Sequence, residues 1–190
     1  MKGKLVYVIG ASGSGKDTLL KNVRKYANRE NLPVLFAHRY ITRPVDAEGE
    51  HHIPLSKSEF MYRSKMGFFA LSWECYSRHY GIGIEINEWL KSNSIVIVNG
   101  SREYLFKAIK RYPNLQAVLI EVSIENIKKR LLKRGRENIQ EMEERLNRAS
   151  KFNIEHEGLI KIYNNRTEQD TLDQFIKVLS KMLFLDEVKI

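Results

Sequence analysis

The sequence G-A-S-G-S-G-K-D occupies residues 10–17 and directly follows the apolar run L-V-Y-V-I at residues 5–9. Beyond it, apolar residues at Leu19, Val23 and Ala27 recur with the spacing of one helix face. A strand, a glycine-rich loop and a helix, in this order, are the setting in which G-x-x-x-x-G-K binds the phosphates of a nucleotide. The sequence therefore predicts a phosphate-binding loop rather than a glycine-rich turn without a ligand.

This loop would bind an anion mainly through its backbone. Glycines allow a tight turn in which consecutive N–H groups point inward, and the N-terminus of the following helix adds partial positive charge. The side chain of Lys16 would reach the β- and γ-phosphates of ATP. The residues predicted to bind ATP are Gly10, Ala11, Ser12, Gly13, Ser14, Gly15, Lys16, Asp17 and Thr18.

Asp17 departs from the usual pattern of such loops. The residue after the lysine is normally Ser or Thr, whose hydroxyl binds Mg²⁺. The Asp17 carboxylate could coordinate the metal directly or through water, because Mg²⁺ prefers oxygen ligands and retains several waters. It could equally be an acidic residue that the helix dipole favours at this end, with water at the metal position. Both interpretations stay open.

Length and charge narrow the class of protein. A chain of 190 residues can bury a sizeable core and is expected to form one domain, residues 1–190. Its 32 basic and 23 acidic residues give a net charge of +9, which favours polyanionic partners. The basic residues are spread along the chain and aromatic RNA-binding motifs are not evident. We therefore expect a phosphorylated small molecule as the partner, and no nucleic acid.

Other features indicate a protein of the reducing cytoplasm. No apolar run approaches the roughly 20 residues that a membrane-spanning helix needs, so no membrane partner is expected. A secretory signal is not expected either, because the first predicted strand begins at Leu5. The single cysteine, Cys75, excludes an intramolecular disulfide and a cysteine-based metal site. Association into a homodimer stays an open option.

Strand-like and helix-like segments alternate along the chain. Strands are expected at residues 5–9, 34–37, 95–98, 117–122 and 160–163, and helices at residues 16–29, 57–64, 85–92, 102–112, 124–134, 139–155 and 171–183. This alternation predicts an α/β fold of the P-loop NTPase type, with three layers and a parallel sheet covered by helices on both faces. Ligands bind beyond the carboxyl ends of such strands, which places residues 10–17, 99–102 and 164–166 around one crevice.

The stretch from about residue 39 to residue 93 is rich in polar and aromatic residues and is predicted to bind the acceptor of a kinase reaction. Arg43 offers a planar fork suited to phosphate, although alone it would more often be a surface arginine. His52 could hydrogen-bond to a substrate; a metal site shared with His51 is disfavoured because adjacent side chains on an extended segment point apart. Glu74 and Tyr80 could contact a sugar or its phosphate, although Tyr80 is equally compatible with burial in the core.

Residues after the central strand are predicted to complete the site. In many P-loop proteins an acidic residue at this strand end binds Mg²⁺ through water. Asn99 stands there instead, so Asp17 is the candidate metal ligand, with the acid moved from one wall of the site to another. Ser101 and Arg102 follow as candidate substrate-binding residues, and Arg102 could bind a phosphate of either nucleotide or acceptor.

A basic helix end, a glycine and a second helix form a predicted lid over residues 134–148. Arginines that a closing lid brings to the phosphates would stabilise the charge on the transferring phosphoryl group. We assign catalytic roles to Arg134, Arg136 and Arg145, together with Lys16. For Arg145, a surface ion pair with Glu141 one helical turn away is an equal alternative.

Together these motifs resemble those of the guanylate kinase-like P-loop kinases and, among them, the family of ribose 1,5-bisphosphate phosphokinases of phosphonate degradation. The resemblance extends over nearly the whole chain. It rests on G-x-S-G-S-G-K-D at residues 10–17, H-R-Y-I-T-R at 38–43, H-I-x-L-S at 52–56, L-S-W at 71–73, Y-G-I-G at 80–83, V-N-G-S-R at 98–102 and R-G-R-E-N at 134–138.

The acceptor motif differs from that of the guanylate kinases. In those enzymes a T-T-R-x-x-R motif and a later tyrosine hold the phosphate of GMP. Here Arg43 takes the position of the first arginine, Asp46 that of the second, and His52 that of the tyrosine. An acid at position 46 would repel a phosphate, which argues against GMP as the acceptor.

The resemblance implies transfer of the γ-phosphoryl group of ATP, with Mg²⁺, to the 1-phosphate of ribose 1,5-bisphosphate, which gives 5-phosphoribosyl 1-diphosphate. The attacking phosphate oxygen is already ionised at neutral pH, so no general base is required, and alignment with charge neutralisation would carry catalysis. The alternatives are a guanylate or other nucleoside monophosphate kinase and a non-catalytic guanylate kinase-like binding module.

Overall fold

The computed structural model describes residues 3–44, 52–75, 77–134, 139–151 and 154–184. Within these residues, a five-stranded parallel sheet has the strand order β2-β7-β1-β8-β9. Its strands are β1 (Lys4–Gly10), β2 (Val34–Phe36), β7 (Ile95–Asn99), β8 (Gln116–Glu121) and β9 (Ile160–Tyr163). β1 lies in the middle, and β7 is buried along its whole length, as expected of a strand that is covered on both faces.

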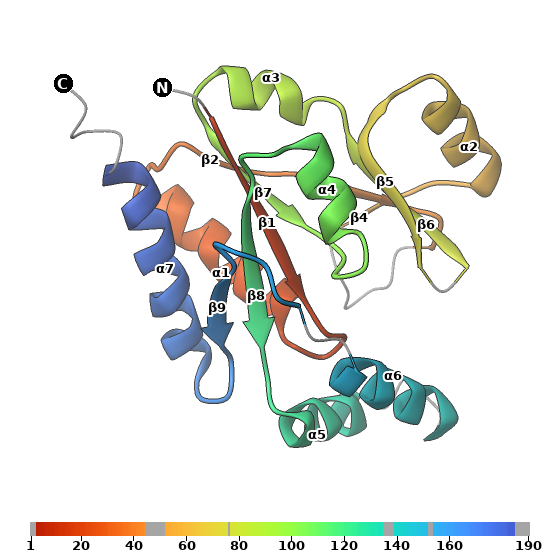
Figure 1. The fold of residues 1–190 in the computed structure, drawn as a ribbon, viewed down its shortest axis with the longest axis vertical. Coiled ribbons are helices and arrows are strands. Elements are labelled where there is room, and N and C mark those ends of the chain that lie inside the picture. Colours follow the sequence, from red (N-terminus) through yellow and green to blue (C-terminus); the bar gives the residue numbers. More distant parts are fainter. Residues whose placement is uncertain (1–2, 45–51, 76, 135–138, 152–153, 185–190) are drawn as a thin grey trace.

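Helices cover both faces of this sheet, which makes three layers (Figure 1). The covering helices are α1 (Lys16–Arg29), α3 (Ile86–Lys91), α4 (Leu105–Arg111) and α7 (Glu168–Phe184). Val6 and Val8 of β1 share a buried cluster with α1 and α7, whereas Tyr7 and Ile9 share another with α3 and α4. Successive side chains of a strand point to opposite faces, so one strand supplies both cores. The predicted three-layer α/β fold is confirmed.

Two further helices, α5 (Ile124–Arg134) and α6 (Ile139–Lys151), lie beyond the carboxyl end of β1 (Figure 1). They pack on each other and on the loop that follows β1. The buried cluster that joins the three segments contains Ala11, Ile127 and Leu131, with Met142, Leu146 and Ala149 packed against it. The glycine-rich loop and the predicted lid are thus in apolar contact.

The segment between β2 and β7 carries a second sheet that the sequence pattern does not predict. In the described part of the chain it has four strands in the order β4-β3-β6-β5. These are β3 (Arg39–Ile41), β4 (His52–Pro54), β5 (Phe69–Cys75) and β6 (Arg78–Gly83), with α2 (Lys57–Lys65) between β4 and β5. Only the helical segments are predicted here. β3 and β4 are three residues long and too short to show an alternating pattern, whereas β5 alternates Leu71, Trp73 and Cys75 with Ser72 and Glu74 and is nevertheless not among the predicted strands.

The second sheet packs against the first through a shared buried cluster. Ala70, Leu71 and Ile82 belong to the same buried cluster as Tyr7 of β1 and Leu105 of α4. The side chains that the second sheet directs at the ligand cavity are therefore held at a fixed distance from the glycine-rich loop.

Three helix ends differ from the prediction by a few residues. α4 begins at Leu105 rather than at residue 102, because a turn precedes it, and α6 ends at Lys151 rather than at residue 155. α7 begins at Glu168, earlier than predicted. Thr167 caps it, since Thr167 Oγ1 accepts a hydrogen bond from the Asp170 N–H at 3.1 Å and Asp170 Oδ2 accepts one from the Thr167 N–H at 3.2 Å.

Gly100, just after β7, leaves no room for a side chain. A Cβ built on it would collide with the ring of Tyr7, which is fully buried, and the Tyr7 hydroxyl accepts a hydrogen bond from the Ser101 N–H at 3.0 Å. Burial raises the pKa of Tyr7 well above its usual range, so this hydroxyl stays neutral. We expect Gly100→Ala to lower the free energy of unfolding by about 1–3 kcal/mol through overpacking. Thermal unfolding checks this, and an unchanged Tm would contradict it.

Candidate active site

The glycine-rich loop between β1 and α1 has the backbone conformation that phosphate binding requires. Gly13 and Gly15 have φ angles of 81° and 84°, in the left-handed region that favours glycine. A Cβ on Gly15 would also lie 2.5 Å from Asn164 Nδ2. Because α1 starts at Lys16, the positive end of its dipole adjoins the loop.

Asn164 and Arg130 donate hydrogen bonds to a carbonyl group of this loop. Asn164 Nδ2 donates to the Ser14 carbonyl at 2.8 Å, and Arg130 donates to the same carbonyl at 3.3 Å. Arg130 also donates to the Asn164 carbonyl at 2.9 Å, and Thr171 Oγ1 donates to Asn164 Oδ1 at 2.9 Å. These contacts use the carbonyl groups of the loop and fix its shape without using its N–H groups, which are the groups that bind phosphate.

Two cations flank the loop. Lys16 Nζ donates to the Gly10 and Ala11 carbonyls at 2.8 Å and 3.3 Å, so it lies across the loop. Arg145 of α6 donates to Ser12 Oγ at 2.8 Å. A polyphosphate in the loop would therefore meet positive charge from both α1 and α6.

Asp17 is held by two neighbours. Asn99 Nδ2 donates to Asp17 Oδ1 at 2.7 Å, and a guanidinium nitrogen of Arg39 lies 3.6 Å from the same oxygen. Asn99 Oδ1 is buried, and no described residue donates a hydrogen bond to it. The Asp17 carboxylate, which is 52% exposed, is thus a candidate ligand of the type that Mg²⁺ prefers, whereas Asn99 turns its amide nitrogen toward it and is not among the residues that line the cavity. The residues present fit a magnesium ion that keeps several waters.

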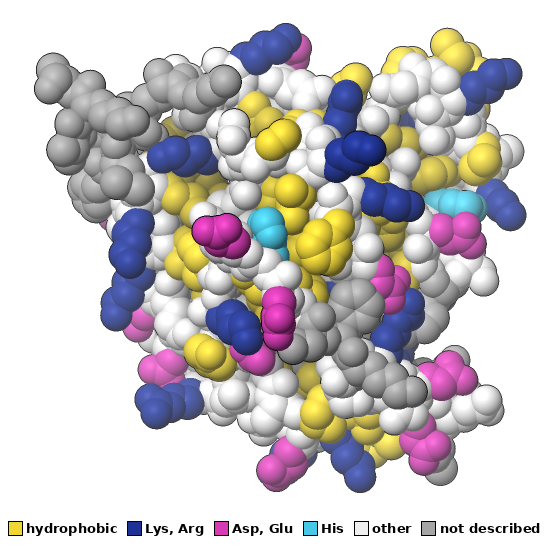
Figure 2. Space-filling view, viewed as in Figure 1, with side chains coloured by type: hydrophobic (Ala, Val, Ile, Leu, Met, Phe, Trp, Pro, Cys, Tyr) yellow, Lys and Arg dark blue, Asp and Glu magenta, His cyan; other side chains and the backbone are white. Residues whose placement is uncertain are grey.

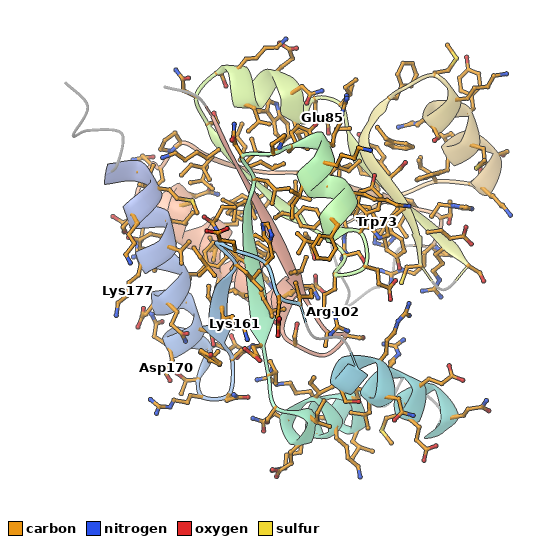
Figure 3. All side chains as sticks on the ribbon, viewed as in Figure 1. Trp73, Glu85, Arg102, Lys161, Asp170 and Lys177 are labelled. Atoms are coloured by element: carbon orange, nitrogen blue, oxygen red, sulfur yellow. The ribbon has the colours of Figure 1, made fainter. Side chains whose placement is uncertain are left out.

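A cavity of about 1020 Å³ joins the loop to the second sheet. Residues 10–19, 100–103, Asn164 and Arg166 line it, so the three segments that the sequence places around one crevice meet here. Figure 3 labels two lining residues, Trp73 at the second sheet and Arg102 on the side toward α6. The cations that line the cavity are Lys16, Arg39, Arg43, Arg78, Arg102, Arg130, Arg145, Arg148 and Arg166, and the carboxylates are Asp17, Glu103, Glu144 and Glu168. This excess of cations suits a polyanionic ligand.

The second sheet contributes a wall of aromatic rings and arginines. Trp73 of β5 stacks on Tyr80 of β6 with ring centroids 5.5 Å apart and ring planes within 3°. Arg39 of β3 lies over the Tyr80 ring at 5.9 Å. Burial raises the pKa of the Tyr80 hydroxyl, while the guanidinium groups of Arg39, Arg43 and Arg78 lower it. The predicted acceptor residue Tyr80 therefore lies in the cavity among cations.

Arg43 and His52 form a pair at the end of β3. An Arg43 nitrogen lies 3.4 Å from His52 Nδ1, and His52 Nε2 lies 3.0 Å from the Arg43 carbonyl. This arrangement assigns the proton to Nε2, which donates to the carbonyl, and leaves Nδ1 as the acceptor. Arg43 lines the cavity, whereas His52 is 7% exposed and is not among its lining residues. His52 thus orients Arg43, in place of the direct substrate contact that the sequence predicts.

Glu74 points away from the cavity. Its neighbours on β5, Trp73 and Cys75, line the cavity, and side chains alternate along a strand, so the exposed Glu74 lies on the opposite face. The structure does not bring Glu74 to the site, contrary to the prediction. The reason is the two-residue period of β5, a strand that is not among those predicted from the sequence.

The remaining predicted residues divide between those at the cavity and those outside the described residues. Ser101 and Arg102 line the cavity, and Arg102 donates to the Arg148 carbonyl of α6 at 3.4 Å. Arg148 pairs with Glu103 at 2.5 Å, so two contacts tie α6 to the turn after β7. Asp46, Arg136 and the side chain of Arg134 lie outside the described residues.

Four lining residues are absent from the predicted site residues, although one lies within the H-R-Y-I-T-R stretch at 38–43 and another within the segment 164–166 that is expected at the crevice. The four are Arg39, Arg78, Arg130 and Asn164. For the first two, the spacing in the sequence is a guide. Arg39 is four residues from Arg43, and Arg78 is two residues from Tyr80, so each pair would share a face of an extended segment.

Comparison with known proteins finds relatives over nearly the whole chain. The guanylate kinase family profile matches residues 2–185. The ribose 1,5-bisphosphate phosphokinase of Psychromonas ingrahamii is 50% identical over 151 residues, which cover 80% of this chain and 76% of the relative. That of Desulfomicrobium baculatum is 49% identical over 162 residues, 85% of this chain and 86% of the relative. That of Pectobacterium parmentieri is 46% identical over 179 residues, 93% of each chain.

Solved structures share the fold. The guanylate kinase from Anaplasma phagocytophilum matches with a TM-score of 0.70 and 14% identity, over 95% of this chain and 87% of that one. A gluconokinase from Sinorhizobium meliloti matches with a TM-score of 0.50 and 16% identity, over 97% of each chain. At such identities the likeness establishes the fold alone.

Proposed function

The chain belongs to the guanylate kinase family and, within it, to the ribose 1,5-bisphosphate phosphokinases, and on this premise we propose that it phosphorylates ribose 1,5-bisphosphate with ATP. The γ-phosphoryl group goes to the 1-phosphate, so the products are 5-phosphoribosyl 1-diphosphate and ADP. The alternative, a nucleoside monophosphate kinase, is not favoured, because the relatives with 46–50% identity named above are all ribose 1,5-bisphosphate phosphokinases.

The observation that carries the proposal is the shared cavity. Its loop end has the backbone of a phosphate-binding site, and its other end presents Arg39, Arg43 and Arg78 from the second sheet. Two polyanions could occupy it side by side, because cations line both ends. Between the two ends lie the stacked rings of Trp73 and Tyr80, with centroids 5.5 Å apart. Cations at both ends of the cavity suit an acceptor that carries phosphate, such as a pentose bisphosphate.

The chemistry requires alignment and charge neutralisation. The attacking oxygen belongs to a phosphate that is already ionised at neutral pH, so no residue has to remove a proton. Lys16 would bind oxygens of the β- and γ-phosphates. Arg145, which contacts Ser12 in the structure, would approach the γ-phosphate from α6. We assign the same role to Arg134 and Arg136 of the lid.

We further propose that ATP binds with Mg²⁺, held near Asp17. When bound, the metal would neutralise charge on the β- and γ-phosphates. Support comes from the exposed Asp17 carboxylate, which lines the cavity beside the phosphate-binding loop and accepts a hydrogen bond of 2.7 Å from Asn99 Nδ2. Asp17, in the first turn of α1, would then take the role of the acidic residue that P-loop enzymes usually carry at the end of the central strand.

Asp17→Ala tests this metal site. We expect the Mg²⁺ concentration for half-maximal activity to rise about tenfold or more, because a charged oxygen ligand is lost. Asp173→Ala is the matched control, since Asp173 lies exposed on α7 and outside the cavity lining. Direct titration of Mg²⁺ against the ADP complex by calorimetry gives a second readout. Equal Mg²⁺ dependence of both variants and the wild type would contradict the assignment.

We propose that the protein acts in the cytoplasm. No helix in the described part of the chain is long and apolar enough to cross a membrane. On the face shown in Figure 2, lysine and arginine side chains are interspersed with acidic and hydrophobic ones and do not form a single patch. This supports a small phosphorylated molecule, rather than nucleic acid, as the partner. The single cysteine, Cys75, suits the reducing cytoplasm. Met61, Tyr62, Met66 and Phe68 at α2 are exposed apolar residues that support a homodimer, which light scattering would test.

Identification of the product tests the proposed function. Purified protein with ATP, Mg²⁺ and ribose 1,5-bisphosphate should form a sugar diphosphate and ADP in equal amounts, which ³¹P NMR resolves from the starting monophosphate signals. Release of inorganic phosphate with no new diphosphate on the sugar would refute it.

A further inference from the structure

We propose that Arg39 binds a phosphate group of the acceptor and thereby determines selectivity for a pentose that carries two phosphates. The inference rests on the proposed function, because it concerns the same acceptor site. It concerns a residue for which the loop and lid motifs give no role.

Arg39 lies on the face of the second sheet that lines the cavity. In β3 it pairs with Ile82 of β6, and Ile41, two residues further on, pairs with Tyr80. Side chains two residues apart share a face, so Arg39, Tyr80 and Arg78 follow one another along this face. The Arg39 side chain is 12% exposed, which places it inside the cavity rather than at its rim.

Arg39 and Arg78 mark the two ends of this face. Arg39 is beside Ile82, and Arg78 is four residues from Ile82 on the same strand, or about 13 Å of extended chain. Arg43 joins Arg78 at the far end, because the Thr42 N–H donates to the His79 carbonyl at 3.1 Å. Long arginine side chains reach inward from both ends, and both Arg39 and Arg78 lower the pKa of the Tyr80 between them. Two separated cations suit a ligand with two phosphates, whereas a monophosphate needs one.

The contact with Asp17 connects Arg39 to the nucleotide loop. That contact is long, at 3.6 Å, and the same Asp17 oxygen already accepts a hydrogen bond of 2.7 Å from Asn99. A guanidinium has five N–H donors and can hold a phosphate through two of them while another faces a carboxylate. Arg39 therefore bridges the two halves of the cavity, with Asp17 on the donor side and the Tyr80 ring, 5.9 Å away, on the acceptor side.

A role for Arg39 confined to holding Asp17 predicts a different result. In that case its loss would disturb nucleotide and metal binding and leave the acceptor's affinity alone. Binding measured without phosphoryl transfer separates the two roles, because ADP cannot donate a γ-phosphoryl group. The experiment is calorimetry of ribose 1,5-bisphosphate with the protein saturated by ADP and Mg²⁺.

We expect Arg39→Met to weaken binding of ribose 1,5-bisphosphate about 30-fold or more, through loss of charge-assisted hydrogen bonds, with ADP affinity changed less than about threefold. Arg39→Lys should fall between wild type and Arg39→Met, because it keeps the charge and loses the fork. The control is Arg63→Met, since Arg63 pairs with Glu59 at 2.6 Å and lies over Tyr40 outside the cavity lining. It should bind acceptor as the wild type does.

Selectivity gives the second readout. Wild-type protein should bind the bisphosphate more tightly than ribose 1-phosphate or ribose 5-phosphate, and Arg39→Met should lose most of that preference. Wild-type acceptor affinity in a folded Arg39→Met variant, with its Tm preserved, would overturn the inference. Failure of the wild type itself to bind or convert ribose 1,5-bisphosphate would instead refute the proposed function.

Discussion

Lys16→Met is expected to lower kcat by about 10³-fold, because it removes the one ammonium group of the glycine-rich loop from the charge that develops in the transition state. Lys16 Nζ already lies within hydrogen-bond distance of the Gly10 and Ala11 carbonyls, so a small movement would bring it to the phosphates. The backbone N–H groups of the loop remain in the variant. We therefore expect the affinity for ADP to fall much less than kcat does.

The control for this variant is Lys21→Met, on the same helix. Lys21 is exposed and is not among the residues that line the cavity. Its variant should match the wild type within about twofold, as surface substitutions usually do. Steady-state rates and calorimetry with ADP check both statements. A Lys16→Met enzyme with more than a tenth of wild-type kcat would contradict the role given to this lysine.

Arg145→Met is expected to lower kcat by about 10³-fold with little change in the KM for either substrate, as found for arginines that stabilise a transferring phosphoryl group. The structure places Arg145 at the loop, where it donates to Ser12 Oγ at 2.8 Å, and α6 is held there by the apolar cluster around Leu131. Because the guanidinium would act on charge that increases in the transition state, the loss should appear in kcat.

Arg29→Met serves as the control for Arg145. The Arg29 side chain is 72% exposed and pairs with Glu30, so its loss should change kcat by less than about twofold. Arg145→Lys should recover part of the activity, since it restores charge without the planar fork. If Arg145 is only a surface ion-pair residue, both Arg145 variants will behave as the Arg29 control does.

The loop, the main sheet and the flanking helices follow from local patterns in the sequence. Gly13 and Gly15 occupy left-handed conformations that glycine adopts without strain, and the apolar strand before them is buried on both faces. These features are contiguous along the chain, so periodicity and a short motif are sufficient to predict them.

The acceptor wall does not follow from local patterns, since it depends on which strands pair. Glu74 and His52 are polar residues in plausible stretches, yet the face of β5 turns Glu74 outward and the fold buries His52 behind Arg43. Conversely, Arg39 enters the cavity only because β3 lies against β6 in a particular register. Pairing of strands far apart in sequence cannot be read from strands three residues long.

The hydrogen bonds that Asn164 and Arg130 donate to the glycine-rich loop also join residues far apart in the sequence. Asn164 reaches the Ser14 carbonyl across 150 residues of sequence, and Arg130 joins them from α5. Neither residue belongs to a phosphate-binding motif of its own. Their roles follow from the order of the sheet, which sets β8 beside β1, the strand that carries the loop, and β9 beside β8.

The most direct test of the central claim is a comparison of acceptors at equal ATP and Mg²⁺. We predict that kcat/KM for ribose 1,5-bisphosphate exceeds that for GMP by about 10²-fold or more, because Arg39 at one end of the acceptor wall and Arg78 at the other suit a ligand with two phosphates, and GMP carries one. Turnover of GMP equal to or faster than that of ribose 1,5-bisphosphate would contradict the account.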